Sequence, residues 1–389
     1  MSPRPGPLNG IKVIELAGIG PGPYAGQLLA DYGADVVVVD RPSNAVVPKG
    51  IDGRGKRSIV LDLKKPEAID ALLKMVAGAD VLIEGLRPGV TERMGVGPDA
   101  CHAINPGLIY GRMTGWGQSG PWSQMAGHDL NYIGMTGMLN AIGKKGEPPM
   151  PPLNMVGDFG GGSMLLVTGI LTALIERART GKGTVVDAAI VDGTHSLMSF
   201  VHGMAGPGLW NVERESNLLD GAAPFYRCYT TSDGKFIAVG CIEPQFFAAM
   251  MERLPIDAEA YGHQQDRGKW PEQHKMLEAV FASKTRDEWE AIFALTDACV
   301  TPVLDYVEAA DHPANAERKA VVKDGKWLHP QVAPRLASHE VADGFVIATK
   351  GGDHASVLAE AGLDEAAIAA LVEAGSVVAG SDNPFWFHP

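Results

Sequence analysis

Two short stretches carry the side chains best suited to chemistry. The first is A-G-H-D-L-N-Y at residues 126–132, and the second is G-D-F-G-G-G-S-M at residues 157–164. His128 follows a glycine in a predicted turn, and Asp158 precedes a run of glycines that opens an apolar segment. An imidazole and a carboxyl group on two such turns can face one site, where one removes a proton and the other returns it. The pair therefore predicts two-base proton transfer.

Asp158 and a third acidic residue, Glu243, also have purely structural explanations. Residues 160–179 predict a helix that ends in basic residues before Gly181, and an aspartate just before such a helix is a common N-cap. The free N–H groups near Gly160 are equally candidates to stabilise an oxyanion. Glu243 lies in the loop C-I-E-P-Q, where its own surroundings favour a solvated carboxylate.

Basic residues recur near the ends of the predicted strands in the first quarter of the chain. Each alone is best explained as a solvated surface charge, but ligands of α/β sheets sit at the carboxyl edge of the strands. Arg and Lys at that edge can hold phosphates in an otherwise acidic protein. The pattern therefore predicts a phosphorylated carrier such as coenzyme A. These residues are Arg41, Lys56, Arg57, Lys64, Arg87 and Arg93.

The elements that must position these residues alternate between strand and helix. Apolar runs predict strands at residues 11–16, 33–40, 57–63, 80–84, 108–113 and 184–190, and helices at 24–31 and 67–77. This alternation predicts an α/β fold with a doubly wound parallel sheet. The turn Gly18-x-Gly20-x-Gly22 resembles part of a dinucleotide fingerprint, but position 23 is proline where G-x-G-x-x-G needs glycine. We therefore reject NAD binding.

The rest of the chain predicts a second, smaller lobe and a return to the first. Residues 191–224 and 305–329 are mixed in composition and are predicted as linkers. Between them, residues 225–304 predict a small α+β domain, with a hairpin at 226–231 and 235–240, a helix at 271–281, and another opened by the capping box Thr285-x-x-Glu288. Ala-rich helices are predicted at 353–360 and 365–373. The large domain is thus predicted over 1–190 and 330–389.

Composition limits the partners. The 389 residues carry a formal charge of −13, which argues against nucleic acid or an anionic membrane as a partner. Cys101, Cys228, Cys241 and Cys299 are scattered without a C-x-x-C pair, as expected for reduced thiols rather than a zinc site. No signal-like segment and no run of about 18 apolar residues is evident. We therefore expect a soluble, cytoplasmic protein.

Seven stretches, in order over nearly the first 190 residues, resemble the class III CoA-transferase family. They are I-K-V-I-E-L-A-G-I-G-P-G-P, G-A-D-V-V-V-V-D-R-P, G-K-R-S-I-V-L-D-L-K, V-L-I-E-G-L-R-P-G-V, R-M-T-G-W-G-Q-S-G-P, A-G-H-D-L-N-Y and V-G-D-F-G-G-G. The His128–Asp129 pair, and a loop after the hairpin that is not glycine-rich, resemble the α-methylacyl-CoA racemase branch. In the transferase branch, the aspartate that matches Asp158 is a nucleophile.

The resemblance implies a Rossmann-like large lobe, an interlocked homodimer, and an active site completed by the partner's small lobe. It implies racemisation of (R)- and (S)-2-methylacyl-CoA thioesters through an enolate, with no metal and no cofactor beyond the coenzyme A of the substrate. His128, Asp158 and Glu243 match catalytic positions, with Asp129 and Asn154 in support. The positions matching acyl-CoA contacts are Arg41, Leu61, Asp62, Leu63, Lys64, Gly85, Leu86, Arg87, Arg93, Gly127, His128, Asp129, Leu130, Asn131 and Tyr132. The alternative is a transferase that moves CoA between carboxylic acids through Asp158.

Overall fold

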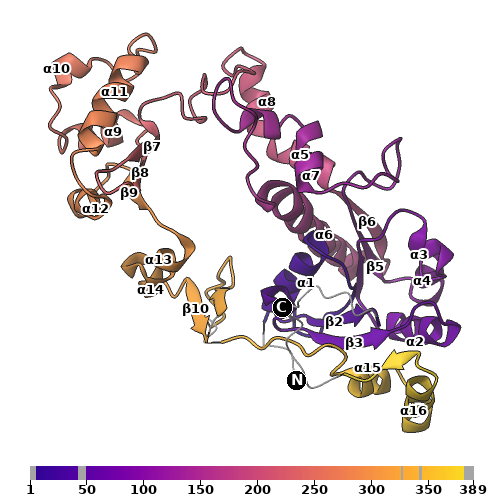
Figure 1. Ribbon diagram of the computed structural model, residues 1–389. Helices are drawn as coiled ribbons and strands as arrows, with labels where there is room; N and C mark the ends of the chain where they lie inside the picture. The colour runs from indigo at the N-terminus through magenta and orange to yellow at the C-terminus, as the bar shows by residue number, and fades with distance from the viewer. Residues whose placement is uncertain (1–5, 43–49, 326, 341–343, 381–389) are drawn as a thin grey trace. The chain divides into compact units, whose positions relative to one another are not determined.

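The computed structural model describes residues 6–42, 50–325, 327–340 and 344–380. The chain forms two compact units, each described by itself below. The large unit consists of Met1–Thr136, Leu153–Leu197 and Lys319–Pro389, and the small unit consists of Gly137–Pro152 and Met198–Arg318. The N-terminal strands and the C-terminal helices thus belong to the same unit although they are far apart in sequence (Figure 1).

A seven-stranded sheet in the order β12-β3-β2-β1-β4-β5-β6 forms the centre of the large unit. Strands β1 to β6 pair in parallel, and β12 runs antiparallel to β3. The order 3-2-1-4-5-6 is that of a doubly wound sheet, so the predicted α/β architecture with a mainly parallel sheet is confirmed. The strands are β1 (Lys12–Leu16), β2 (Asp35–Asp40), β3 (Arg57–Leu61), β4 (Val81–Glu84), β5 (Ile109–Thr114), β6 (Thr184–Ala189) and β12 (Val377–Val378).

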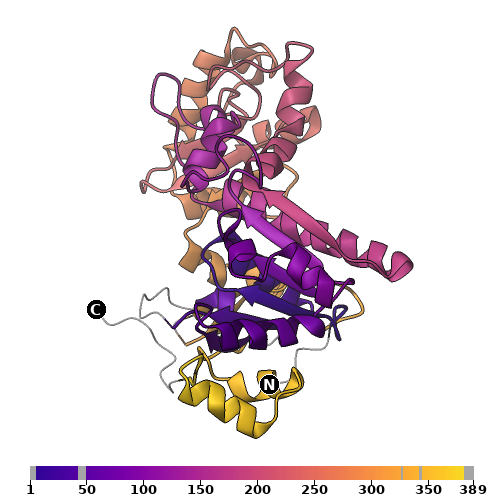
Figure 2. The same ribbon diagram turned by 90° about the vertical axis from the view of Figure 1, so that its right-hand side faces the viewer.

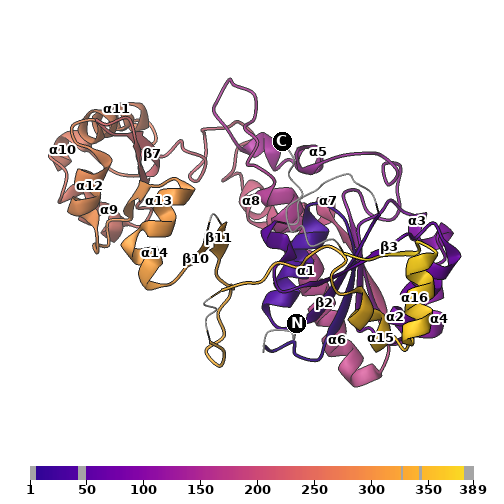
Figure 3. The ribbon, with the colours of Figure 1, turned by 60° about the horizontal axis from the view of Figure 1, so that its bottom comes forward.

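Helices cover both faces of this sheet, as Figure 3 shows. Because successive side chains of a strand point to opposite faces, Val13 packs with α1 (Pro21–Asp31) and α6 (Leu165–Thr180), whereas Ile14 packs with α2 (Pro66–Ala77) and α15 (His354–Glu360). Burial on both faces explains the run of four consecutive valines in β2, Val36 to Val39, all of which are buried. The other helices of this unit are α3 (Val90–Arg93), α4 (Pro98–Ile104), α5 (Asp129–Met135), α7 (Ile190–Leu197) and α16 (Glu365–Glu373), with the short 3₁₀ turn η1 (Ile51–Gly53).

The C-terminal part of the large unit closes the β3 side of the sheet. Helix α15 contacts α2 and β3, and α16 packs against α15. Figure 2 shows these two yellow helices together beneath the indigo strands. The helices predicted at 353–360 and 365–373 are confirmed as α15 and α16, and they bury Val357 and Leu358 in the core shared with β3. A two-stranded ribbon, β10 (Val321–Asp324) with β11 (Trp327–Pro330), precedes them.

The direction of the sheet connections reverses between β1 and β4. Strands β2 and β3 follow β1 on one side, and β5 and β6 follow β4 on the other. In open α/β sheets, ligands bind in the crevice beyond the carboxyl ends of the strands at this point. The loops that leave β1 at Leu16 and β4 at Glu84 therefore border the expected ligand site.

The segment around Asp158 differs from the prediction. Residues Met155–Met164 form a π-helix, η3, which continues directly into α6. Asp158 therefore lies in the first turn of a helix with Asn154 as its N-cap, and the prediction that Asp158 itself precedes the helix is wrong. The predicted end is confirmed, because Arg177 and Arg179 occupy the last turn and Gly181 adopts a left-handed C-cap with φ 70°.

Close packing around η3 requires its glycines. A Cβ atom on Gly161 would lie 2.7 Å from Thr194 Oγ1 of α7, and one on Gly157 would lie 2.6 Å from Asp129 Oδ2 of α5. Neighbouring helices thus touch the η3 main chain directly. By length and composition the continuous helix 155–180 is also long and apolar enough to cross a membrane, as the core helices of soluble proteins can be. Leu166 and Ile170 are fully buried in the core of the large unit.

The small unit contains an antiparallel three-stranded sheet, β7 (Tyr226–Thr230), β8 (Phe236–Gly240) and β9 (Val300–Val303). The predicted hairpin is confirmed as β7–β8, and the capping box is confirmed because Thr285 N–H donates to Glu288 Oε2 at 2.8 Å. Trp289 and Phe281 pack edge to face in the aromatic core of this unit. The helices are α8 (Ser199–Ala205), α9 (Pro244–Met251), α10 (Ala258–Tyr261), α11 (Trp270–Phe281), α12 (Arg286–Phe293), α13 (Tyr306–Asp311), α14 (Pro313–Glu317) and the turn η2 (Leu139–Ala141).

Candidate active site

Asp158 lies at the carboxyl end of β1. The turn between β1 and α1 passes so close that a Cβ atom on Gly20 would lie 3.1 Å from Asp158 Oδ2. Gly20 has φ 70°, a conformation that favours glycine, so this residue both forms the turn and leaves room for the carboxyl group. Asn154 Nδ2 donates to Asp158 Oδ2 at 3.3 Å. The carboxyl group therefore borders the crevice where the sheet connections reverse.

His128 is the N-cap of α5. Its backbone N–H donates to Asn131 Oδ1 at 3.0 Å, and its carbonyl accepts from Asn131 N–H at 2.8 Å. These bonds hold the His128 backbone, whereas the side chain is exposed. His128 itself is extended rather than in the predicted turn, and it presents an accessible imidazole on an anchored main chain.

Asp129 connects the two segments that carry His128 and Asp158. Its side chain is buried, and Oδ2 accepts from the Asp158 backbone N–H at 2.7 Å. The first residue of α5 is thus tied to the first turn of η3 across 29 positions of sequence. The family resemblance implies a supporting part for Asp129, and the contact that the structure gives its carboxylate is to Asp158.

The surroundings of Asp158 disfavour its ionised form. Burial raises the pKa of this carboxyl group, and the negative charge of Asp129 raises it further. The hydrogen bond from Asn154 and the charge of a protonated His128 act in the opposite direction and lower the pKa. Burial, together with the Asp158 charge, raises the pKa of Tyr132. The charge of His128 thus acts on the Asp158 carboxyl group, and the catalytic part of the two residues stays a prediction.

The predicted oxyanion donor at Gly160 is not supported. Gly160 lies inside η3, and the repeating bond of a π-helix takes an N–H group to the carbonyl five residues earlier. The N–H group of Asp158 is also engaged, by Asp129. The expectation of free N–H groups at Gly160 is therefore wrong, because the helix begins five residues before this glycine.

The basic residues fall into two groups. Lys56 and Arg57 are buried in ion pairs, with Lys56 Nζ 2.7 Å from Glu15 Oε2 and Arg57 Nη2 2.6 Å from Asp35 Oδ2, so their prediction as phosphate contacts is wrong. The remaining four side chains are exposed, and no ion pair between described residues involves them. They follow β2, β3 and β4 at the edge where Asp158 lies: Arg41, Lys64, Arg87 and Arg93.

A buried ion pair at the same edge escaped sequence analysis. Arg112 Nε lies 2.9 Å from Glu84 Oε1, and the other oxygen of Glu84 accepts from Leu86 N–H at 2.6 Å. Arg112 also pairs with Glu92 at 2.7 Å. Burial raises the pKa of Glu84 against the opposing effect of these bonds. The pair fixes the loop with Gly85 and Leu86. Its one signal in the sequence is a charged residue near the end of each of two apolar strands.

The other predicted contacts lie at the end of β3 and around the start of α5. Leu61 is buried at the end of β3, Asp62 and Leu63 are half-buried, and Asp62 Oδ1 accepts from Lys64 N–H at 3.2 Å. Gly127 and Tyr132 pack together, with Tyr132 Oη donating to Gly127 O at 2.5 Å, while Leu130 is exposed. Both segments belong to the large unit. Glu243 is an exposed N-cap of α9 in the small unit, and its catalytic part stays a prediction.

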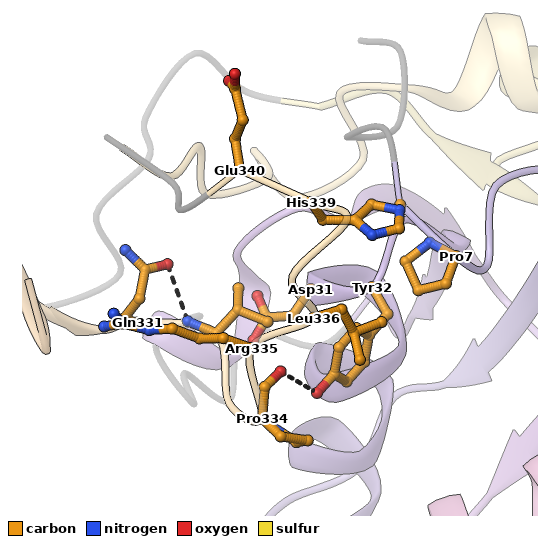
Figure 4. A pocket seen from close by; sticks show the side chains of 11 residues that line it. Pro7, Asp31, Tyr32, Gln331, Pro334, Arg335, Leu336, His339 and Glu340 are labelled. Atoms are coloured by element: carbon orange, nitrogen blue, oxygen red, sulfur yellow. Dashed lines mark hydrogen bonds between the residues drawn. The ribbon is translucent and has the colours of Figure 1, made fainter. Parts of the chain in front are cut away.

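A separate pocket lies at the other end of α1. It holds about 400 Å³ of space open to solvent and is bordered by Asp31, Tyr32 and the segment 331–340. Tyr32 Oη donates to Pro334 O at 2.7 Å across it (Figure 4). Asp158 lies near the start of α1 and this pocket near its end, about 16 Å apart by helix length. The pocket is therefore distinct from the His128–Asp158 site.

Comparison with known proteins places the chain among enzymes of CoA chemistry. The family model described as CoA-transferase family III matches residues 8–341. The chain is 48% identical over 331 residues to alpha-methylacyl-CoA racemase of Mus musculus, covering 85% of this chain and 86% of that protein. It is 44% identical over 354 residues to alpha-methylacyl-CoA racemase of Homo sapiens, covering 91% and 92%.

The fold has counterparts among solved structures. A CAIB/BAIF family protein from Brucella suis matches with a TM-score of 0.80 and 26% identity, over 92% of this chain and 100% of that chain. The parallel sheet with helices on both faces and the matched sequence length agree with the family match. The chain belongs to CoA-transferase family III.

Proposed function

We propose that this protein is an isomerase that interconverts (R)- and (S)-2-methylacyl-CoA thioesters by 1,1-proton transfer. The observation that carries the proposal is the half-buried Asp158 carboxyl group, whose pKa is raised, in electrostatic contact with the exposed imidazole of His128. Such a pair supplies one group that holds a proton and one that can take it. The likeness to alpha-methylacyl-CoA racemases of mouse and human supports the same reaction.

The reaction needs two half-steps. Neutral His128 takes the α-proton from one face, and the C–H electron pair moves into the thioester as an enolate. The Asp158 carboxyl group then donates its proton to the opposite face of the α-carbon, which leaves aspartate and imidazolium. The opposite epimer uses the same groups in reversed roles. Because the thioester carbonyl itself acidifies the α-hydrogen, we propose that no metal or added cofactor takes part.

The coenzyme A part of the substrate fits the exposed cations. Arg41 and Lys64 lie beyond β2 and β3, on one side of β1, and Arg87 and Arg93 follow β4, on the other side. Neighbouring strands are about 4.8 Å apart, so the two groups flank the crevice over a distance that an extended CoA can span. We propose that these side chains hold its phosphates. The buried Glu84–Arg112 pair keeps the Gly85–Leu86 loop in place for the same ligand.

We further propose a cytoplasmic homodimer in which Glu243 of the partner's small lobe approaches His128. Exposed apolar side chains on the large unit support an interface, because such surface is normally covered. They include Ile19, Leu130, Met135, Met155, Met164 and Ile175. All four cysteines are free, as expected for a reducing compartment. A molecular mass of twice 41.1 kDa, measured by analytical ultracentrifugation, would support the dimer, and the mass of a single chain would contradict it.

Proton NMR in D₂O tests the reaction. Wild-type protein is incubated with (R)- or (S)-2-methylacyl-CoA and no free carboxylic acid. We expect loss of the α-hydrogen signal and interconversion of the epimers. If neither epimer exchanges, and CoA moves only after an acceptor acid is added, the transferase reaction through Asp158 replaces the proposal.

A further inference from the structure

Asp129 is a buried carboxylate with an unusual set of partners. Its side chain is 5% exposed, and no ion pair within the described parts of the chain involves it. Oδ2 has one bond, from the Asp158 backbone N–H at 2.7 Å, and Oδ1 is buried without a hydrogen-bond partner among the described residues. A buried charge with so little compensation is costly. A cost of this kind calls for a reason beyond packing.

The surroundings place this charge directly against the Asp158 main chain. A Cβ atom on Gly157 would lie 2.6 Å from Asp129 Oδ2 and 2.9 Å from Ile133 Cγ2. Only glycine at position 157 lets η3 approach α5 this closely. The carboxylate is therefore built into the contact between the two helices, beside the residue from which the reacting carboxyl group extends.

We propose that Asp129 is a positioning residue for Asp158: it anchors the Asp158 main chain through Oδ2, and its negative charge disfavours a second negative charge on the Asp158 side chain. The inference rests on the proposed function, because it matters when Asp158 must hold a proton for delivery to the α-carbon. It differs from a role in orienting the imidazole of His128, since the contact made by the carboxylate is to Asp158.

Several ionisable groups besides Asp129 surround η3, the helix that carries Asp158. The charges that act on Asp158 are those of Asp129, which raises its pKa, and of His128, which lowers it, while Asn154 lowers it as a hydrogen-bond donor. Ionisable side chains also lie on the elements packed against η3: Tyr132 of α5, Tyr24 of α1, Arg112 of β5, Glu176, Arg177 and Arg179 of α6, Asp187 of β6, and Asp192 and His195 of α7.

The substitution Asp129→Asn separates charge from anchoring. The amide oxygen can still accept the Asp158 N–H bond, but the negative charge is lost. We expect the apparent pKa values in the pH profile of kcat/KM to move to lower pH by about one unit, the size of a neighbouring-charge effect. At neutral pH, kcat falls roughly tenfold, the rate equivalent of that shift. Asp129→Ala removes anchor and charge together, and we expect the same direction of shift with a larger loss of kcat.

The matched control is Asp187→Asn. Asp187 of β6 also accepts a backbone N–H, from Gln118 at 3.4 Å, but its charge is not among those that act on Asp158. We expect its pH profile to match wild type. If Asp129→Asn folds, as checked by circular dichroism, and lowers kcat without moving the profile, Asp129 is merely structural and the inference is overturned. Absence of α-proton exchange in wild type would instead overturn the proposed function itself.

Discussion

At position 158 the chain holds a carboxyl group in surroundings that disfavour its ionised form. Burial and the Asp129 charge both raise the pKa of Asp158, and the Asn154 bond and the His128 charge only partly oppose them. An acid that keeps its proton nearer to neutral pH is a better proton donor in catalysis. The same property should make the site a source of instability, because the native state resists ionisation that the unfolded chain permits.

The substitution Asp158→Asn tests whether the raised pKa of Asp158 destabilises the native state. The pKa of Asp158 is higher in the native state than in the unfolded chain. Its carboxyl group therefore makes its full contribution to the free energy of unfolding below the ordinary aspartate pKa of about 3.9. That contribution is lost as the pH rises through the native pKa. We expect the asparagine variant to have a larger free energy of unfolding than wild type at pH 8, with the difference shrinking toward pH 4. Urea unfolding at several pH values measures it. Racemisation should fall by about 10²–10⁴-fold. A variant equally less stable at both pH values would contradict the account.

Among the helices and strands, the apolar strands could be predicted and the π-helix could not. Strands β1 to β5 each contain a run of apolar residues, because helices cover both faces of the sheet. The two-residue strand β12 and the proline-containing β9 lack that signal. The glycines of η3 permit a helix of either spacing, so the sequence does not distinguish a π-helix from an α-helix. Helices α5, α1 and α7 all pack against η3, and no local pattern in the sequence specifies these contacts.

The packing of η3 against α7 predicts an effect of Gly161→Ala. The added Cβ would lie 2.7 Å from Thr194 Oγ1 and 2.8 Å from Thr194 N, and the backbone cannot yield as a flexible side chain would. We expect a destabilisation of about 1–3 kcal/mol. The matched control is Gly203→Ala in α8, where nothing lies within 4 Å, and it should be neutral or slightly stabilising. Equal thermal unfolding midpoints for the two variants would contradict this packing.

For the whole molecule, the sequence indicated which residues could react but not how they are brought together. His128 and Asp158 were recognisable from residue type and from the family resemblance. Their connection through Asp129 spans 29 positions, and no local pattern reveals it. Likewise Lys56 and Arg41 are both basic residues near the ends of predicted strands. Only the fold shows that Lys56 is buried against Glu15 while Arg41 is exposed. Long-range pairing thus separates structural charges from those available to a ligand.

The measurement that tests the central claim most directly is α-hydrogen exchange in D₂O with His128→Ala and Asp158→Ala, each assayed on each epimer separately. Two opposed groups predict that each variant fails to racemise but still exchanges the α-hydrogen of one epimer, and that the two variants act on opposite epimers. Exchange of the same epimer by both variants, or full racemisation by either, would contradict a mechanism in which His128 and Asp158 serve opposite faces of the α-carbon.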